Sequence, residues 1–278
     1  MCTGLPGPRF ASNPSVCKPY TIVVVIGVED HDGYVVSALY EPWSRELIRR
    51  AQVWRGDRVV DLACGTGIVA CRIAGTGAQV TGVDASAAVL EQAKRRAAEE
   101  AVPVSWLMRD PAATTLRSAS AELVTCQQGL QFATDRAAVV REAKRLLVSG
   151  GRAVFACWCP IAEQLGHRII DAVATRHFGG GYGADYSLGE PAEVKSLFEA
   201  ARFMATQIET VHRVVRFPEP ARFAELALRS IASERGASEA AIVAALAEAN
   251  EQLAPLVYDG QLEVMTASLI AIGRVSAR

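Results

Sequence analysis

Three aspartates stand at the ends of three successive apolar runs of this sequence. The runs occupy residues 58–62, 79–83 and 104–108, and Asp61, Asp84 and Asp110 lie at or just beyond their carboxyl ends. Because ligands of an open parallel sheet bind outside the carboxyl ends of its strands, the three carboxylates would share one crevice. There they repel each other unless they bind a ligand with several donors. A ligand with a cationic amine, a vicinal diol and an exocyclic amine would fit.

A glycine-rich segment follows the first aspartate. Residues 65–70 read Gly-Thr-Gly-Ile-Val-Ala and match G-x-G-x-x-A, a pattern typical of dinucleotide sites. Asp84 follows at the distance where a carboxylate would bind the ribose of a nicotinamide or another nucleoside cofactor. Asp61 distinguishes a nicotinamide cofactor from another nucleoside cofactor, because a nicotinamide-binding strand is ordinarily apolar at this position. A buried carboxylate is favourable beside a ligand ammonium but unfavourable beside a pyrophosphate. The alternative is structural: Asp61 would cap a helix, and Asp84 and Asp110 would be turn residues.

Strand and helix patterns alternate from residue 56 onward. Five apolar runs predict strands, at 58–62, 79–83, 104–108, 122–126 and 152–158. This alternation is typical of a doubly wound α/β fold with a mostly parallel sheet. Residues 35–53 predict an amphipathic helix or helix pair before it. The remaining sequence predicts helices near 161–177, 191–202, 220–232 and 238–254, an extended segment at 206–217 and a final strand near 262–272.

The composition is that of a folded globular chain. Of the 278 residues, 50% are hydrophobic and 21% are charged, which suits a chain that buries a core. The 29 Lys and Arg against 30 Asp and Glu give no electrostatic reason to expect a nucleic-acid or anionic-membrane partner. The seven cysteines and four histidines lack the spacing of a metal site. We therefore expect no metal, and reduced thiols in a cytoplasmic protein.

The N-terminal segment differs from the rest. Residues 1–19 hold four prolines and two glycines, and the apolar run at 21–28 is too short to span a bilayer. No small-residue cleavage pattern follows that run. We expect residues 1–30 to be a poorly ordered extension without a membrane span.

Four motifs in order resemble those of a known enzyme family. VVDLACGTGIVA at 59–70, VTGVDAS at 80–86, CQQGLQF at 126–132 and EAKRLLVSGGRAVFACW at 142–158 are similar to the class I S-adenosylmethionine-dependent methyltransferases. The similarity is greatest to the small-molecule branch that includes the quinone-biosynthesis C-methyltransferases. It covers about residues 34–217. It implies a doubly wound, mostly parallel, seven-stranded Rossmann-like sheet whose last strand is antiparallel, with a helical insertion before that strand.

The resemblance also implies a division of the chain. Residues 31–278 would form one methyltransferase domain. Within it, residues 31–55 would be an N-terminal helical lid, 56–160 the cofactor-binding half, and 218–260 a helical insertion that shapes the acceptor pocket.

Site residues follow from the resemblance position by position, with S-adenosylmethionine as the cofactor. Asp61 would orient the methionine ammonium, and Gln127 would face the methionine tail near the methyl group. Asp84 would accept from both ribose hydroxyls, a geometry that suits a carboxylate. The loop between them would line the methionyl and ribose portions through Ala63, Gly65, Thr66 and Gly67.

The adenine end departs from the family pattern. The resemblance implies that Ala85 packs on adenine and that Asp110 accepts from its exocyclic amine. Family members generally carry a residue with a free backbone N–H after this acid, but Pro111 has none. The contact would then be lost or made by Ala112, at a cost of about 1 kcal/mol of binding.

The acceptor side is less defined by sequence. Tyr34 and Trp43 match positions that cover the cofactor in the family, and Gln128 and Gln131 lie where the family shapes its acceptor pocket. In-line methyl transfer from a sulfonium requires mainly alignment and exclusion of water, so a small-molecule acceptor can react without a dedicated base, and the sequence assigns no catalytic residue. Two alternatives stay open: a non-catalytic protein that binds S-adenosylmethionine or S-adenosylhomocysteine, which the Pro111 departure favours, and a nicotinamide-dependent reductase, which lacks a Tyr-x-x-x-Lys pair here.

Overall fold

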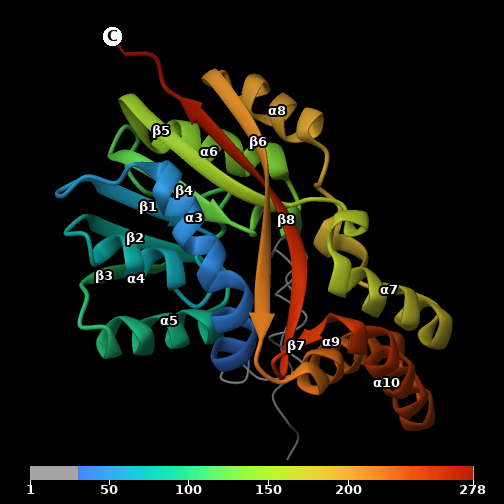
Figure 1. Cartoon of the computed structure of the whole chain (residues 1–278). Coiled ribbons are helices and arrows are strands. Elements are labelled where there is room, and N and C mark those ends of the chain that lie inside the picture. The colour runs from blue at the N-terminus through green and yellow to red at the C-terminus, as the bar shows by residue number, and fades with distance from the viewer. Residues whose placement is uncertain (1–30, 278) are drawn as a thin grey trace, which may run out of the picture.

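A computed structural model describes residues 31–277 of the chain (Figure 1). The expectation about residues 1–30 lies outside the described residues. Within the described part, no helix has the length and apolar character that crossing a membrane requires.

A single twisted sheet forms the centre of the fold. Its strands run in the order β3-β2-β1-β4-β5-β8-β6, and a short strand, β7, pairs with β8. Strands β1 to β5 are parallel, whereas β8 is antiparallel to both β5 and β6. The mostly parallel α/β sheet with an antiparallel last strand is confirmed. The strands are β1 (Arg58–Leu62), β2 (Gln79–Asp84), β3 (Val104–Met108), β4 (Ala121–Gln127), β5 (Leu147–Trp158), β6 (Met204–Phe217), β7 (Val257–Tyr258) and β8 (Gln261–Arg274).

Helices cover both faces of this sheet. A π-helix, η1 (His31–Tyr40), leads into the first α-helix, and two helices lie between β6 and β8, where the insertion was predicted. Figure 1 shows this pair, α9 and α10, beside α7 at one end of β8. The helices are α3 (Glu41–Ala51), α4 (Ile68–Ala74), α5 (Ala87–Glu99), α6 (Arg136–Leu146), α7 (Leu165–Phe178), α8 (Pro191–Ala200), α9 (Pro220–Arg235) and α10 (Glu239–Leu253). Short 3-10 helices are η2 (Leu130–Phe132), η3 (Ile161–Glu163), η4 (Gly183–Tyr186) and η5 (Ala254–Leu256).

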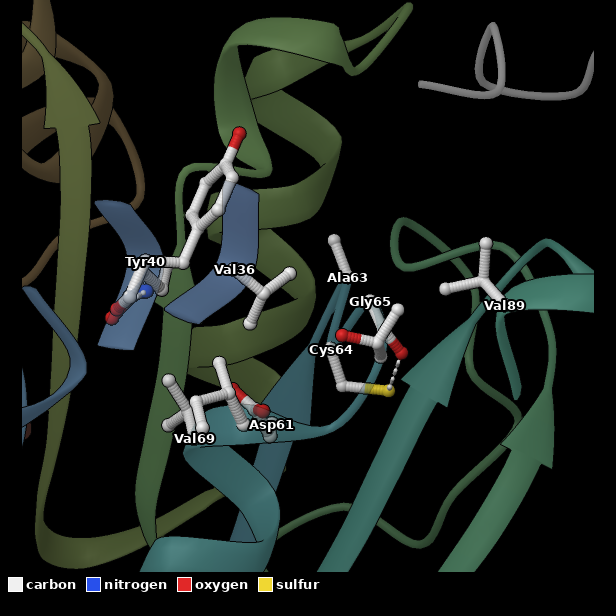
Figure 2. A pocket seen from close by; sticks show the side chains of 11 residues that line it. Val36, Tyr40, Asp61, Ala63, Cys64, Gly65, Val69 and Val89 are labelled. Carbon is white, nitrogen blue, oxygen red and sulfur yellow. Dashed lines mark hydrogen bonds between the residues drawn. The ribbon is translucent and has the colours of Figure 1, made fainter. Parts of the chain in front are cut away.

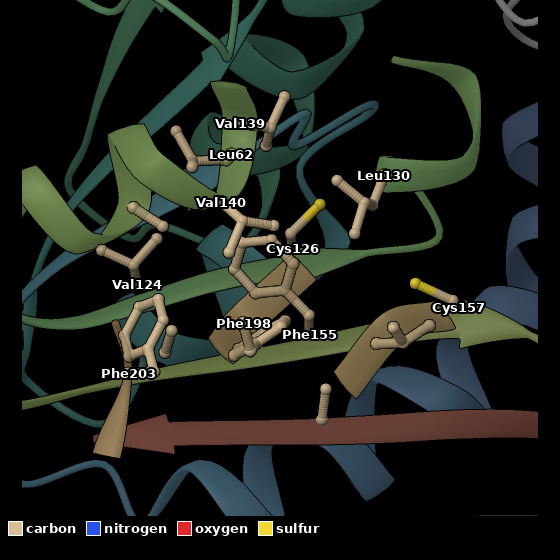
Figure 3. Packing of buried hydrophobic residues seen from close by; sticks show 14 of the residues in the cluster. Leu62, Val124, Cys126, Leu130, Val139, Val140, Phe155, Cys157, Phe198 and Phe203 are labelled. Carbon is tan, nitrogen blue, oxygen red and sulfur yellow. The ribbon is translucent and has the colours of Figure 1, made fainter. Parts of the chain in front are cut away.

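Neighbouring residues of one strand enter different cores, because successive side chains of a strand point to opposite faces. Val59 of β1 belongs to a core with Leu47 of α3. Val60 belongs to a second core with Val140 of α6 and Phe198 of α8, part of which is drawn in Figure 3. The strand is therefore held on both faces, which fixes the loop that follows it.

Local capping places two helix starts at the carboxyl edge of the sheet. The Ser86 hydroxyl accepts from the backbone N–H of Val89 at the start of α5. The Asp135 carboxylate accepts from the N–H of Ala138 at the start of α6, with an N–O distance of 2.8 Å. Such caps satisfy N–H groups that have no partner within the helix.

Candidate active site

The glycine-rich loop after β1 requires left-handed backbone. Ala63, Gly65 and Gly67 have φ angles of 51°, 55° and 83°. At Gly67, a Cβ atom would lie 2.7 Å from the ring of Trp106, so glycine is needed for space as well as for conformation. Ala63 carries a side chain in the same backbone region, which is unfavourable for a residue with a Cβ. The loop thus holds its amides in a tight turn at the start of α4.

Asp61 is buried at the end of β1. Its side chain is 1% exposed, and its Oδ1 accepts from the Thr125 hydroxyl at 2.7 Å. Its Oδ2 has no hydrogen-bond partner among the described residues. Burial raises the pKa of this carboxyl to about 7, the Thr125 hydrogen bond lowers it, and the Asp84 charge raises it again. No cationic side chain among the described residues contributes to this pKa.

A cavity opens beside Asp61, and we call it the Asp61 cavity. It encloses about 470 Å³, including its open mouth. Figure 2 shows Val36 and Tyr40 of η1 across from the loop residues. Gln127 also lines it; its Nε2 donates to the Tyr40 carbonyl at 3.0 Å, while its Oε1 has no partner among the described residues. The lining residues are Val36, Tyr40, Asp61, Ala63, Cys64, Gly65, Thr66, Ile68, Val69, Val89 and Gln127.

Asp84 ties the loop to the start of α5. Its Oδ2 accepts from the N–H of Gly65 and its Oδ1 from the N–H of Ser86, each at 3.0 Å. The side chain is 6% exposed, and burial raises the pKa of its carboxyl although the Ser86 and Gly65 amides lower it. Each carboxylate oxygen can accept further hydrogen bonds. Asp84 therefore combines a structural role with unused acceptor capacity.

A second cavity, the Asp110 cavity, lies on the other side of Ala63. It encloses about 800 Å³ with its open mouth. Asp110 is exposed, and its Oδ1 accepts from the N–H of Ala112 at 2.8 Å. That N–H is thus already used in a local turn and does not replace the donor that Pro111 lacks. The lining residues are Ala63, Asp110, Pro111, Ala112, Cys126, Gly129, Ala133, Thr134, Asp135 and Val139.

A third cavity, the tyrosine cavity, shares Tyr40 with the Asp61 cavity. It encloses about 700 Å³ with its open mouth. Its walls come mainly from η1, α7, η4 and α9, with Trp158 of β5 and Phe132 of η2, so the helical insertion contributes to it. The lining residues are Val35, Leu39, Tyr40, Phe132, Trp158, His167, Gly181, Tyr182, Asp185, Tyr186, Ser230, Ile231 and Glu234.

The structure brings most of the predicted cofactor residues together. Asp61, Ala63, Gly65, Thr66 and Gln127 line one cavity. Asp110 and Pro111 line the cavity that shares Ala63 with it. Three residues line neither: Gly67 and Asp84, which support the loop, and Ala85, which is partly exposed beside Asp84.

None of the four predicted acceptor residues lines any of these three cavities. Trp43 is fully buried, packs edge-on against Trp158 and donates its Nε1–H to Thr266, so it is a core residue in this structure. Gln128 is also buried, and its Nε2 donates to the Ser268 hydroxyl.

The other two predicted acceptor residues are Gln131 and Tyr34. The Gln131 Nε2 lies 3.3 Å from the Gln128 Oε1, and the side chain is buried. Tyr34 lines a small cavity of about 330 Å³ together with His167, and its hydroxyl donates to the Glu219 carbonyl. Tyr34 is therefore close to the tyrosine cavity, which shares His167, but does not line it.

Sequence reasoning missed Tyr40 and Val36. They lie four residues apart on the N-terminal helical segment, next to the face on which Leu39 and Trp43 enter the core. The sequence shows both faces as apolar or aromatic. The sequence does not indicate which face of this segment would contact a ligand.

Part of the chain matches a known protein family. Residues 60–155 match the family described as "Methyltransferase domain". Together with the sheet order, this match supports the class I S-adenosylmethionine-dependent methyltransferase that the sequence motifs predicted. No group of His, Cys, Asp or Glu side chains within residues 31–277 could hold a metal ion.

A curated enzyme is similar to part of this chain in sequence. A ubiquinone biosynthesis O-methyltransferase from Pectobacterium atrosepticum is 34% identical over 110 residues, which cover 39% of this chain and 46% of that protein. The chain spans about half the length of the curated relatives it matches.

Solved structures agree on the fold. A putative methyltransferase from an antibiotic biosynthesis pathway of Anabaena variabilis superposes with a TM-score of 0.61 and 13% identity, covering 82% of this chain and 96% of that one. A Haemonchus contortus phosphoethanolamine N-methyltransferase, in complex with phosphomonomethylethanolamine and S-adenosylhomocysteine, superposes with a TM-score of 0.55 and 16% identity, covering 85% of this chain and 53% of that one.

Proposed function

We propose that this chain transfers a methyl group from S-adenosylmethionine to a small-molecule acceptor. The observation that carries the proposal is the buried Asp61 carboxylate, with one oxygen lacking a partner among the described residues, on the wall of a cavity beside the glycine-rich loop. A ligand ammonium next to Asp61 would restore the charged form that burial disfavours. The methyltransferase match and the cofactor complexes of structural neighbours support the same cofactor.

Asp84 and Asp110 carry acceptor groups for the ribose and the adenine of the cofactor. Asp84 has acceptor capacity for the ribose hydroxyls beyond its bonds to Gly65 and Ser86. Asp110 has its Oδ2 for an exocyclic amine, since Oδ1 accepts from Ala112. Because the Asp61 and Asp110 cavities meet at Ala63, one elongated ligand could reach both.

Methyl transfer then becomes a matter of alignment. When bound, S-adenosylmethionine supplies a methyl group on a positively charged sulfur. Tyr40 stands between the Asp61 and tyrosine cavities, so an acceptor in the tyrosine cavity would approach from that side. Gln127 holds the backbone of Tyr40 in place through its side-chain amide. Residues 31–55 would cover the reactants and exclude water, an arrangement worth up to about 7 to 11 kcal/mol in favourable cases.

A non-catalytic protein that binds the same cofactor is the second candidate. One observation favours it: the N–H of Ala112 is occupied and Pro111 has none, so adenine recognition lacks a donor. Incubation with labelled S-adenosylmethionine and candidate acceptors separates the two, because only an enzyme transfers the label.

Ligand-dependent unfolding tests the shared premise. S-adenosylhomocysteine at about 100 times its dissociation constant should stabilise the fold by about 2.7 kcal/mol. NADPH serves as the control for the nicotinamide alternative: it also carries adenine and ribose, but it has a 2′-phosphate on that ribose and a pyrophosphate in place of the ammonium-bearing amino acid. A shift with NADPH and none with S-adenosylhomocysteine would contradict the proposal.

A further inference from the structure

The tyrosine cavity is both aromatic and acidic. Among the described residues that line it there are two carboxylates, Asp185 and Glu234, and no Lys or Arg. Aromatic rings supply much of the remaining wall, from Tyr40, Phe132, Trp158, Tyr182 and Tyr186. Aromatic faces and carboxylates both attract cations, and neither favours an anionic ligand.

Asp185 lines the tyrosine cavity together with these aromatic residues. Burial first, and then the charge of Glu234, raises the pKa of its carboxyl to about 7. The Asp185 charge in turn helps to raise the pKa of the Tyr40, Tyr182 and Tyr186 hydroxyls, after burial. Asp185 and the three tyrosines line the same cavity, and among the described residues no Lys or Arg lines it to balance the carboxylate charge.

His167 adds an independent sign of a ligand. It is 7% exposed, and its Nδ1 has no hydrogen-bond partner among the described residues. Its ring lies 5.6 Å from the Tyr182 ring and 6.0 Å from the Tyr186 ring, measured between centroids, on the wall of the same cavity. Burial lowers the pKa of this imidazole to about 4, so it is neutral at neutral pH. A neutral imidazole nitrogen can accept a hydrogen bond from a ligand N–H.

We propose that the tyrosine cavity binds the methyl acceptor, and that this acceptor is a primary or secondary amine with an apolar body, protonated in solution. Asp185 pairs with the ammonium, His167 accepts one of its hydrogens, and the aromatic rings enclose the apolar body. The inference rests on the proposed function, because it assigns the acceptor of that same reaction.

The transfer step is balanced by the groups in the cavity. The ammonium gives one proton to the Asp185 carboxylate, which frees the nitrogen lone pair. That lone pair forms the new nitrogen–carbon bond to the methyl group as the sulfur–carbon bond breaks, and the sulfur keeps the bonding electrons. The positive charge moves from sulfur to the N-methylated product, and S-adenosylhomocysteine leaves neutral at sulfur.

Three probes of similar shape and different charge test the assignment. Phenethylamine is a cation at neutral pH, phenethyl alcohol is neutral and hydrocinnamate is an anion. Each is titrated calorimetrically into the full chain in the presence of S-adenosylhomocysteine. The amine should bind at least about tenfold more tightly than the alcohol, and the anion most weakly. Equal or tighter binding of the alcohol or the anion would overturn the proposal, as would failure of the amine to bind at about 1 mM.

A substitution of Asp185 tests whether this residue causes the tighter binding of the amine. In Asp185→Asn, the advantage of the amine over the alcohol should largely vanish, while the affinity for S-adenosylhomocysteine stays unchanged. Asp259→Asn is the matched control, an exposed aspartate in the β7–β8 turn, and it should keep the advantage. An amine preference that survives in Asp185→Asn would overturn the role of Asp185. Absence of S-adenosylhomocysteine binding in the first titration would instead contradict the proposed function, and the probes would then be compared without it.

Discussion

Replacement of Asp61 by Asn should stabilise the ligand-free fold and weaken cofactor binding at the same time. Asn is close in shape to Asp, and its Oδ1 can still accept from the Thr125 hydroxyl, which lies 2.7 Å from Oδ1 of Asp61. The substitution removes the charge that burial disfavours and places an NH2 donor where Oδ2 stands. A charge that costs folding free energy without a ligand, and is useful with one, is typical of a functional site.

The size of the effect follows from the pKa of Asp61. Its carboxyl shifts from 3.8 to about 7 on folding. At 1.36 kcal/mol per pKa unit, ionising Asp61 in the folded protein costs on the order of 4 kcal/mol above pH 7. Because the folded pKa is raised, the folded state holds the proton more tightly, so wild-type stability falls as pH rises from about 4 to about 7. Near pH 5 the cost has decreased to about 2 kcal/mol.

Urea unfolding of both proteins near pH 8 and near pH 5 measures this cost. We expect Asp61→Asn to be the more stable protein at the higher pH, by up to about 4 kcal/mol, and the difference to shrink at the lower pH. The stabilisation that S-adenosylhomocysteine gives should be smaller in the variant. Asp259→Asn, at an exposed turn, controls for loss of a carboxylate. An Asn variant that is less stable near pH 8, or a difference that does not depend on pH, would refute the reasoning.

Three further substitutions probe the site. Asp84→Asn should lower the affinity for S-adenosylhomocysteine by about 2 kcal/mol in calorimetry, because it removes the ribose acceptor charge, whereas unchanged affinity would make Asp84 a turn residue only. Pro111→Ala should tighten the same binding by up to about 1 kcal/mol by restoring a donor, and lower the melting temperature slightly through the unfolded state; weaker binding would show that the proline ring contributes. Ala63→Gly should raise the free energy of unfolding by about 0.5 to 1 kcal/mol, because Ala63 has a φ of 51°, and a destabilised variant would mean that the contacts of its partly buried methyl group matter more.

The sheet was predictable from sequence because its signals are local. Short apolar runs separated by helix patterns mark β1 to β5, and Asp61 and Asp84 mark the ends of two of them. The loop at 63–67 carries its own signal, since a tight turn needs glycine. These features depend on neighbours along the chain, and most of the predicted cofactor residues accordingly line two cavities that share Ala63.

The tyrosine cavity, where we propose that the acceptor binds, was not predictable because it is built from distant segments. Tyr40, His167 and Asp185 come from separate elements, and nothing in their local sequence sets them apart from core or surface residues. Trp43 shows the converse. It matches a position that covers the cofactor in the resembling family, but here it donates its Nε1–H to Thr266, 223 residues away, and packs in the core.

A crystal structure of the chain with S-adenosylhomocysteine tests the central claim most directly. The account predicts the methionine ammonium beside Oδ2 of Asp61, the ribose hydroxyls on Asp84, and adenine in the Asp110 cavity, with the sulfur on the side of Tyr40. Adenosine bound away from Asp61 and Asp84, or a ligand that leaves the unpartnered oxygen of Asp61 without a cation, would contradict it.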